Sequence, residues 1–477
     1  MLRLIIAKEI TESLLNRRFL VIAAFSVVLL VISGVVNYEY YQARQASFDS
    51  QYASFTRDKS NDDVRAYRPP ELLSVLARGT EPYMPLYFDF GTSEQTLGQV
   101  DVGNIEAEDF RLLASLGSLD FLFLVQVVFS LLAILLSFDM IAGEKERGTL
   151  RAVLANSVPR DKVILGKAIG GFLVLLIVFL IGALLLFAIL SAMDGRFLRA
   201  DTLVRFLAVI GFSAVYIAGF FMIGLMISSL CHTGRTAIVS LLVVWVTLLL
   251  VIPKLAEATA TLALPVRSEE SLRVEKTTLI AELDQRKMDE SGKIYEEIFQ
   301  TDRLNSSLIS QETPEAEQFR EAYQKMNEGI ASEAATRLRE IDEGFERERR
   351  SQRRLSYALA ILSPTSAHGF LVSDLAGTGD IAFENFQDNA SDYYARLRSG
   401  PLAAVTSQSV RVRIGGSSVW MNIGDEFDWD SIPTFQATEI DLPRILRRNT
   451  WALVSLGLFV LIPFLLAYVS FIRYDVR

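Results

Sequence analysis

Hydrophobic residues gather in six long blocks along the chain. A bilayer core of roughly 30 Å takes about 20 helical residues, and each block comes close to or reaches that length. The pattern predicts an α-helical polytopic membrane protein with six transmembrane helices. The predicted spans are residues 19–36, 121–141, 169–190, 207–229, 237–252 and 451–472.

Lysines and arginines beside the spans predict which ends face the cytoplasm. Arg17 and Arg18 precede the first span, and the segment between the second and third spans, residues 142–168, is rich in both residue types. Short loops of this kind stay on the cytoplasmic side. With six spans, residues 1–18 and the tail 473–477 are therefore both expected in the cytoplasm.

The first residues have the pattern of an amphipathic helix. Leu2, Ile5, Ile6, Ile10 and Leu14 recur at helical spacing, and charged residues, Glu9 among them, occupy the rest of the helical wheel. Residues 1–18 are therefore expected to form an interfacial helix on the cytoplasmic leaflet. A simple extension of the first span is the alternative.

Two long segments, residues 37–120 and 253–450, are expected outside the membrane on the far side. In the second, helix-forming residues flank a polar break at 301–313, which predicts a long antiparallel helical hairpin over about 266–353. Its predicted apolar seam consists of Leu272, Leu279, Leu283, Ile294 and Ile298 on one arm and Phe319, Tyr323, Met326, Ile330, Ile341 and Phe345 on the other.

Two shorter patterns complete this outer domain. Residues 355–375 are moderately apolar, but Pro364 interrupts them, so they are expected to form a helix, a break and a second helix, folded against the outer domain or lying on the outer leaflet. Residues 410–414 and 419–423 alternate around two glycines, which predicts a small β-hairpin.

Composition narrows the possible functions. The chain is 51% hydrophobic and 22% charged, with a net charge of −9, which argues against a nucleic-acid partner. One cysteine, Cys231, and two histidines supply neither a disulfide framework nor a Cys/His metal site within one chain. The predicted spans contain almost no ionisable residue, and Asp139, near the cytoplasmic end of the second span, is expected to have a solvated or capping role. Without buried carboxylates at mid-membrane, the energy for transport is expected to come from elsewhere.

The cytoplasmic loop 142–168 has the pattern of a short protruding helix. Gly148 ends the second span, Thr149 is expected to cap a new helix, and Pro159 with Asp161 is expected to cap the helix that becomes the third span. A short charged helix between two spans suits docking into a groove on a partner and transmitting rigid-body motion.

This loop resembles the signature loop of the ABC-2 type permease family. The resemblance is carried by Glu144-x-Glu146-x-Gly148-Thr149-Leu150, Ser157-x-Pro159 and Gly166-Lys167, and the order of elements in the membrane part is similar. The outer segment also resembles the DUF3526 group of these permeases at Leu362-Ser363-Pro364, at 375–380 and at 432–435. The large outer insert departs from the simplest members, so no substrate is carried over.

The resemblance implies a permease subunit in a bacterial cytoplasmic (inner) membrane. It implies a homo- or heterodimer of permeases and two copies of a separate cytosolic ABC ATPase, which would bind ATP and magnesium. The residues expected to couple to that ATPase are Glu144, Glu146, Arg147, Gly148, Thr149, Leu150, Arg151 and Pro159.

No catalytic, cofactor-binding or metal-binding residue is assigned to this chain. Its expected cytoplasmic parts sum to only about 57 residues, too few for a nucleotide-binding domain. Gly143 to Gly148 has the glycine spacing of a phosphate loop, but Thr149 stands where lysine is required.

Three functions remain open from the sequence. The first is ATP-driven export or extrusion of a substrate. The second is ATP-driven mechanical transmission to a periplasmic partner through the long hairpin. The third is a membrane-anchored sensor or scaffold, although no cytoplasmic output domain is evident.

Overall fold

The computed structural model confirms a largely helical chain with six helices long and apolar enough to cross a membrane. These candidate spans are Phe19–Phe55, Phe121–Glu146, Arg160–Met193, Ala200–Leu230, Gly234–Ala263 and Thr450–Ile472, among the residues searched. The structure describes residues 2–57, 63–81, 84–91, 100–103, 119–155, 159–301, 313–399, 409–414, 417–422, 433–438 and 440–474.

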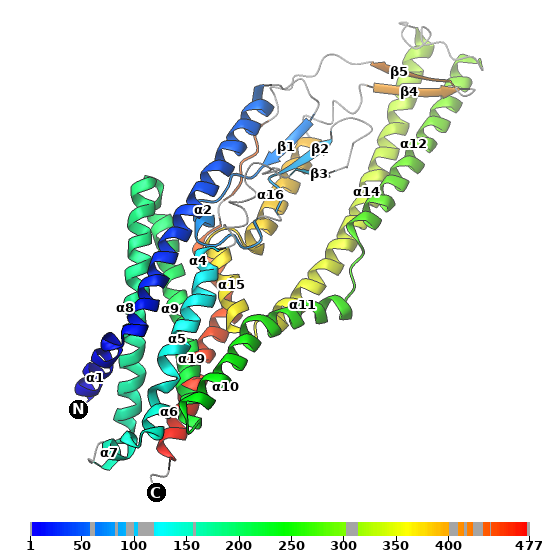
Figure 1. Cartoon of the computed structure of the whole chain (residues 1–477). Coiled ribbons are helices and arrows are strands. Elements are labelled where there is room, and N and C mark those ends of the chain that lie inside the picture. Colours follow the sequence, from blue (N-terminus) through cyan, green and yellow to red (C-terminus); the bar gives the residue numbers. More distant parts are fainter. Residues whose placement is uncertain are drawn as a thin grey trace.

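The six spans form one bundle with two distinct ends. Helix α1 (Leu2–Leu15) and the last turn of α19 (Thr450–Ile472) lie at the same end, which we call the terminal end (Figure 1). At the opposite, distal end the chain continues into a long helical hairpin and a smaller mixed unit. Six spans with both end helices at one end agree with the predicted topology, and which side of the membrane each end faces stays a prediction.

The first span is much longer than its hydrophobic block. Helix α2 (Arg17–Arg57) runs without a break for 41 residues, whereas the sequence predicted a span ending at residue 36. It is separated from α1 at Asn16, whose side-chain oxygen accepts a hydrogen bond from the Phe19 amide at 3.4 Å. The two are therefore separate helices, and the simple extension of span one is wrong.

Helix α1 packs against α8 (Arg160–Met193), and one residue of its predicted polar face points inward. Glu9 is only 5% exposed, while Leu14, assigned to the apolar face, is 48% exposed. The helical wheel was wrong at these two positions because Glu9 has a buried cationic partner on α8.

The second and fifth spans are assembled from shorter helical pieces. The second consists of α4 (Phe121–Leu124), the π-helical turn η4 (Val125–Phe129), α5 (Ser130–Ser137) and α6 (Asp139–Glu146). The fifth consists of α10 (Gly234–Val246), the π-helical turn η6 (Thr247–Val251) and α11 (Ile252–Ala263). The carbonyl of Gln126, in the first π turn, accepts a hydrogen bond from the Tyr216 hydroxyl at 3.0 Å. Wider turns thus supply backbone acceptors to neighbouring spans.

The fourth span, α9 (Ala200–Leu230), lies against much of the rest of the bundle. It packs on α5, on α19 and on α15 (Pro364–Leu375). Its aromatic residues Tyr216, Phe220 and Phe221 are fully buried in the main apolar cluster. A short 3₁₀ turn, η5 (Gly195–Leu198), joins it to α8.

Residues 355–375 contain the predicted break, and the helix after it makes contacts beyond those predicted. Ser363 caps α15, its hydroxyl accepting from the Thr365 amide at 3.1 Å, and Pro364 is the first residue of the helix. Helix α15 contacts α16 (Asp380–Ser399) and α18 (Leu442–Arg448) of the outer part, as expected, and it also packs on the spans α9 and α19. His368 is completely buried, and its Nε2 lies 3.0 Å from the Ser213 hydroxyl of α9.

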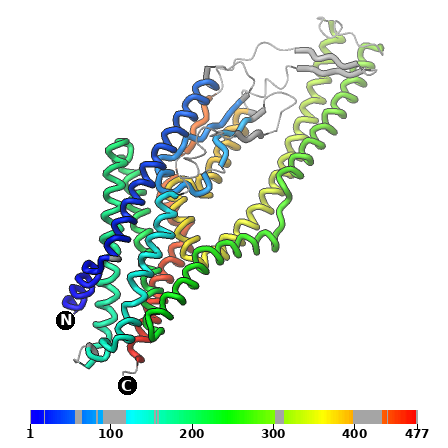
Figure 2. The backbone as a smooth tube through the Cα atoms, viewed as in Figure 1, coloured from blue at the N-terminus to red at the C-terminus, as the bar shows by residue number. Residues whose placement is uncertain are grey.

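The long hairpin is confirmed. Helices α12 (Glu269–Phe299) and α14 (Pro314–Ala360) run side by side away from the bundle (Figure 2). Leu279, Leu283 and Ile330 of the predicted seam are buried between them. Nearer the far end Tyr295, not Ile294 or Ile298, is the fully buried residue, and its ring packs edge-on against Phe319.

A small antiparallel sheet that the sequence did not predict lies in the first outer segment. Its strands are β1 (Asp63–Tyr67), β2 (Tyr87–Gly91) and β3 (Val100–Gly103), in the order β1-β2-β3. Val64, Ala66 and Phe88 pack against Phe386 of α16 (Asp380–Ser399). The predicted second hairpin is confirmed as β4 (Ser409–Ile414) and β5 (Ser417–Asn422). A 3₁₀ turn, η1 (Leu72–Val75), and a short helix, α18 (Leu442–Arg448), complete this region.

One lysine in the hairpin makes its stability depend on pH. Lys287 is 7% exposed, lies 5.6 Å from the Tyr323 ring centre, and burial lowers its pKa to about 8. Its folded pKa lies below its unfolded value near 10.4, so the folded state binds fewer protons between those limits, and stability rises as pH rises from about 8 to 10.

We therefore expect Lys287→Met to slow chymotrypsin cleavage of the hairpin at pH 7, with the advantage over the natural chain shrinking by pH 10. Lys293→Met, at an exposed position of the same helix, is the matched control and should change neither rate. A pH-independent difference between Lys287→Met and the natural chain would contradict the role given to the lysine charge.

Candidate functional site

The predicted protruding helix is present at the terminal end. Gly148 has a φ of +74°, a left-handed conformation that ends α6 and turns the chain into α7 (Thr149–Ala155). Figure 1 shows α7 at the tip of the bundle. A Cβ at Gly148 would meet nothing within 4 Å, so the backbone conformation, not space, requires glycine there.

The two predicted caps differ from expectation in detail. Thr149 is the first residue of α7, and its hydroxyl donates to the Glu144 carbonyl at 3.4 Å, so it closes the end of α6 and does not cap α7. Pro159 occupies the N-cap position of α8 without a side-chain hydrogen bond, and Asp161 lies in the first turn. Asp161 there is favourable because carboxylates stabilise helix N-termini.

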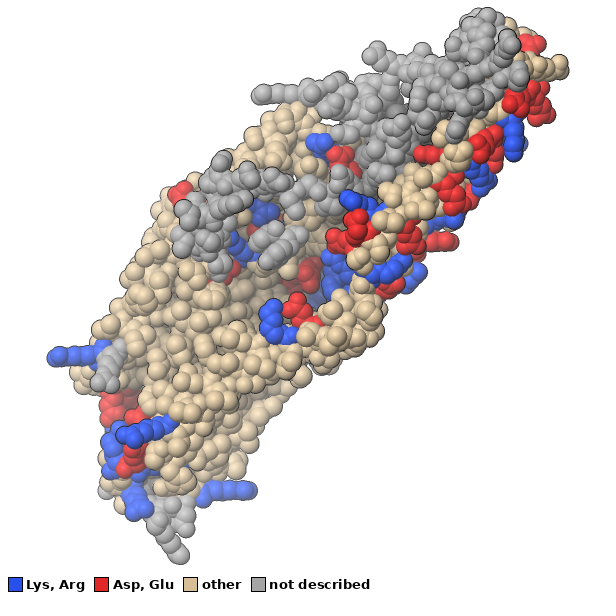
Figure 3. Space-filling model, turned by 45° about the vertical axis from the view of Figure 1, so that its right-hand side comes forward, with Lys and Arg blue, Asp and Glu red and all other residues tan. Residues whose placement is uncertain are grey.

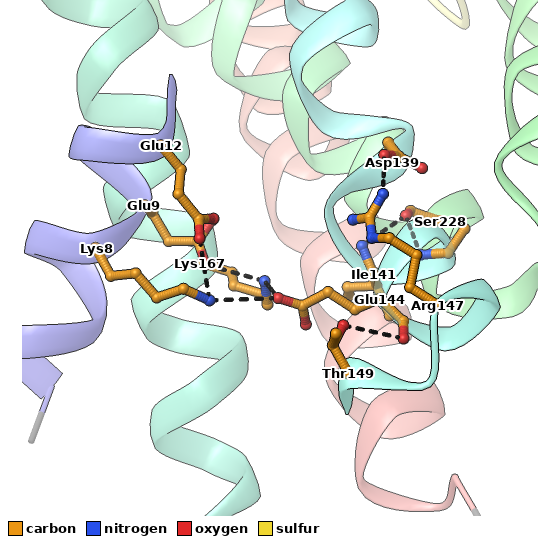
Figure 4. Close-up of polar contacts among 11 residues, drawn as sticks. Lys8, Glu9, Glu12, Asp139, Ile141, Glu144, Arg147, Thr149, Lys167 and Ser228 are labelled. Carbon is orange, nitrogen blue, oxygen red and sulfur yellow. Dashed lines mark hydrogen bonds and ion pairs between the residues drawn. The ribbon is translucent and has the colours of Figure 1, made fainter. Parts of the chain in front are cut away.

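A buried ionic cluster joins three helices beneath α7. The Lys167 ammonium of α8 lies 2.9 Å from Glu9 of α1 and 2.9 Å from Glu144 of α6 (Figure 4). These three side chains are only 4%, 7% and 10% exposed. Lys8 adds a contact to Glu144 at 3.6 Å and one to Glu12 at 3.5 Å. A buried charge is tolerated only when it is paired, so α1, α6 and α8 are tied to one another.

Two glycines allow α1 to come this close. A Cβ at Gly166 would lie 2.5 Å from Ile5 Cγ2, and one at Gly170 would lie 2.9 Å from Glu9 Cβ and 3.2 Å from the Ile6 backbone. They are four residues apart and therefore share one face of α8. Only glycine at both positions permits α1 to lie directly on α8.

Helix α6 is also fastened to the link between α9 and α10. The Ser228 hydroxyl accepts from the amides of Ile141 and Ala142 at 3.0 and 2.9 Å, which satisfies donors left free by the helix break at Phe138. Figure 4 shows this serine facing the start of α6.

Two further contacts complete the link. The Lys145 ammonium donates to the Ser229 carbonyl and, at 3.2 Å, to the Cys231 carbonyl. Glu146 accepts from the Gly234 amide at 2.9 Å, at the first residue of α10. A carboxylate at a helix N-terminus is stabilised by the exposed amides there.

The eight residues predicted for coupling therefore separate into two sets. Glu144 and Leu150 point inward, Leu150 into an apolar cluster with Ile141 and Phe471. The six exposed residues are Glu146, Arg147, Gly148, Thr149, Arg151 and Pro159. Asp139 is 41% exposed and pairs with Arg147 at 3.2 Å, in agreement with the solvated role predicted for it.

Sequence analysis missed the partners that hold this site together. Glu9, Lys167 and Ser228 come from three different helices, and no local pattern relates them. One signal was present: Lys167 stands directly before a long apolar run, where an ammonium needs a counter-charge. Arg160 was missed as well, and it donates to the carbonyls of Ile472 and Tyr474 at 2.6 and 2.9 Å, tying α8 to the end of α19.

The described residues of this site connect helices through ion pairs and hydrogen bonds, and they show no arrangement typical of a catalytic site. Across the described residues, no group of three or more His, Cys, Asp or Glu side chains is arranged to hold a metal ion. The arrangement instead joins the protruding helix to α1 and to the third, fourth and fifth spans.

Removal of the central lysine should destabilise the bundle. Lys167→Met leaves Glu9 and Glu144 buried as like charges, and loss of one partner from such a cluster costs about 3–5 kcal/mol. We expect a clearly lower thermal unfolding midpoint, followed by tryptophan fluorescence of the purified chain.

Lys162→Met, at an exposed position one turn earlier, is the control and should leave the midpoint nearly unchanged. Adding Glu9→Gln to Lys167→Met should restore part of the loss. Equal midpoints for the Lys167 and Lys162 variants would show that the cluster contributes no net stability.

Comparison with known families agrees with this architecture. The model of a family described as ABC-2 family transporter protein matches residues 3–476, nearly the whole chain. A comparison with curated proteins gives no match. The resemblance to the DUF3526 group stays a prediction. Six candidate spans, the short helix at their terminal end and the match over almost every residue lead to one conclusion: the chain belongs to the ABC-2 family of transporters, as a membrane permease component.

Proposed function

We propose that this chain is the permease subunit of an ABC-2 transporter in which a separate cytosolic ABC ATPase docks on α7 and drives export or extrusion of a substrate. The observation that supports this most directly is the attachment of α7. It projects from the terminal end, and α6 behind it is tied to α1 and α8 by the Glu144–Lys167–Glu9 cluster and to α10 through Glu146.

This attachment suits transmission of movement. A force on α7 reaches α6 across two residues, Arg147 and Gly148, and α6 is fixed by side-chain contacts to α1, α8, the last turn of α9 and the start of α10. Packed helices joined by ion pairs shift as rigid bodies rather than deform. The movement would therefore reach α1 and the third, fourth and fifth spans together.

Charge distribution supports a cytoplasmic terminal end. Lysines and arginines gather there, and the adjoining surface of the spans is a broad belt without charged side chains (Figure 3). The positive-inside bias of short loops then places α7 in the cytoplasm, where an ATPase is available. In this proposal the ATPase binds ATP and magnesium, two ATPase copies serve two permease subunits, and the complex lies in a bacterial cytoplasmic membrane.

A second function is favoured by the connection between the fifth span and the hairpin. Helix α11, the last part of the fifth span, packs on the root of α14, and α12 is the next helix along the chain. Movement of the fifth span would therefore displace the hairpin. ATP-driven action on a periplasmic partner, with nothing crossing the membrane, is the alternative proposal.

Isolation of the partner tests the proposal. The tagged chain, purified from native membranes, should carry a stoichiometric ATPase identified by mass spectrometry. Glu146→Arg replaces the acceptor of the Gly234 amide with a cation beside a helix N-terminus, which repels it. We expect loss of the co-purifying ATPase or of its coupling, with expression unchanged.

Glu257→Arg, an exposed charge reversal on α11 (67% exposed), serves as control and should retain the ATPase. Recovery of the natural chain without any ATPase under mild conditions would favour the sensor or scaffold function instead.

A substitution pair at Gly148 tests the turn itself. Proline fixes φ near −65° and cannot adopt the observed +74°, whereas asparagine enters the left-handed region more readily than other residues with a Cβ. We expect Gly148→Pro to abolish the stimulation of ATPase activity by the permease in nanodiscs, and Gly148→Asn to retain most of it. Unchanged stimulation in Gly148→Pro would remove α7 from the coupling route.

A further inference from the structure

A large cavity lies at the distal end of the bundle, where the hairpin joins it. Its volume is about 990 Å³, and it is enclosed by the root of α14, by α15, by the first turns of α16 and by the ends of the second, fifth and sixth spans. The coupling site is at the opposite end of the bundle. In Figure 3 charged side chains of both signs gather where the hairpin meets the uncharged belt.

One wall of the cavity is a face of α14 rich in hydrogen-bond donors. Arg350, Arg353, Arg354 and Tyr357 all line it, and their spacing places them on one side of the helix over two turns. Among the residues that the structure describes, the buried Tyr357 hydroxyl has no hydrogen-bond partner, and neither has Nε of Arg353. Buried donors of this kind normally have an acceptor, which points to a ligand.

Two of these arginines keep their charge available. Arg354 forms no ion pair among the residues that the structure describes, and Arg350, 58% exposed, reaches only to 3.9 Å from Glu346. Arg353 contacts both Glu346, at 3.6 Å, and Glu384, at 4.0 Å. Adjacent guanidinium groups with a free fork are the usual protein partners of phosphate.

Five carboxylates also line the cavity, and three of them, Glu346, Glu384 and Asp374, have partners within the protein. Glu384 also pairs with Arg448. Asp374 accepts from the Asn449 side chain at 2.7 Å and from the Ile381 amide at 3.3 Å, and burial raises its pKa to about 6. Asp380 and Asp388 are exposed carboxylates at the rim.

The remaining wall is apolar and continues onto the surface of the fifth span. Leu122, Leu249, Pro253 and Phe370 line it, and the neighbouring Leu250 is 55% exposed. The cavity thus has hydrogen-bond donors on one wall and an apolar surface on the other, which opens toward the lipid-facing side of the fifth span. Such a site fits a molecule with a charged head and a hydrocarbon tail.

We infer that this cavity binds the phosphate-bearing headgroup of an amphiphile, with the phosphate on Arg350, Arg354 and the Tyr357 hydroxyl and the hydrocarbon along Leu249 and Pro253. A membrane phospholipid and a soluble phosphate ester share the headgroup chemistry, and the test distinguishes them. The inference concerns binding by this chain alone and does not depend on an ATPase, so it can fail or hold independently of the proposed coupling.

The test is native mass spectrometry of the full chain in maltoside detergent, titrated with phosphatidylglycerol. We expect a saturable one-to-one adduct. The double variant Arg350→Gln/Arg354→Gln should bind about tenfold more weakly or worse, because removing one charge-assisted hydrogen bond lowers the affinity by about a factor of ten. Arg339→Gln/Arg347→Gln removes two exposed arginines from the same helix outside the cavity, and it should bind like the natural chain.

Two further arms complete the experiment. Tyr357→Phe, which keeps the ring packed on Phe370, should weaken the adduct severalfold without affecting folding. Glycerol 3-phosphate competes with the lipid if the ligand is a soluble phosphate ester, and fails to compete if the hydrocarbon is required. Equal binding of diacylglycerol, which lacks the phosphate, or an unchanged affinity in the Arg350/Arg354 double variant would overturn the inference.

Discussion

The burial of one ammonium group between two carboxylates organises the terminal end of this permease. Lys167 stands directly before the apolar stretch of the third span. Glu9 and Glu144, from two other helices, each lie 2.9 Å from its ammonium group. None of the three could be buried alone, because an unpaired charge in such a place is far too unfavourable. The position of α1 on α8 and the direction in which α6 leaves the second span both follow from this requirement.

Different kinds of contact hold the helices together at the two ends of the bundle. At the terminal end the contacts are specific and polar, and several are made to backbone amides, as with Ser228 and Glu146. At the distal end, α15 enters the bundle as an apolar helix and α11 passes directly into the hairpin region. The outer part is therefore continuous with the membrane part, because helix α11 belongs to the fifth candidate span and also packs on the hairpin.

Sequence patterns predicted what depends on local order. Six apolar blocks, the heptad-like seam of the hairpin, and the stop signals Gly148 and Pro364 all appear in the structure close to where the pattern indicated. Contacts between residues far apart in the sequence could not be predicted from such patterns. Glu9 and Lys167 are 158 residues apart, and the strands β1 to β3 each offer too few residues for alternation to stand out. The packing of α15 on two spans was not predicted, because a moderately apolar helix fits a bundle as well as a surface.

The unbroken length of α2 has a consequence for how the two ends communicate. At 1.5 Å per residue, its 41 residues extend about 60 Å, twice the thickness of a bilayer core. Near its far end Phe48, Tyr52 and Phe55 pack on Tyr67 of the small sheet, so the helix is held at that end too. A stiff rod of this length acts as a lever arm: a tilt of about 5° at its base displaces its tip by about 5 Å. Small rearrangements beside α1 would then become ångström-scale displacements of the outer sheet, with no moving joint needed between them.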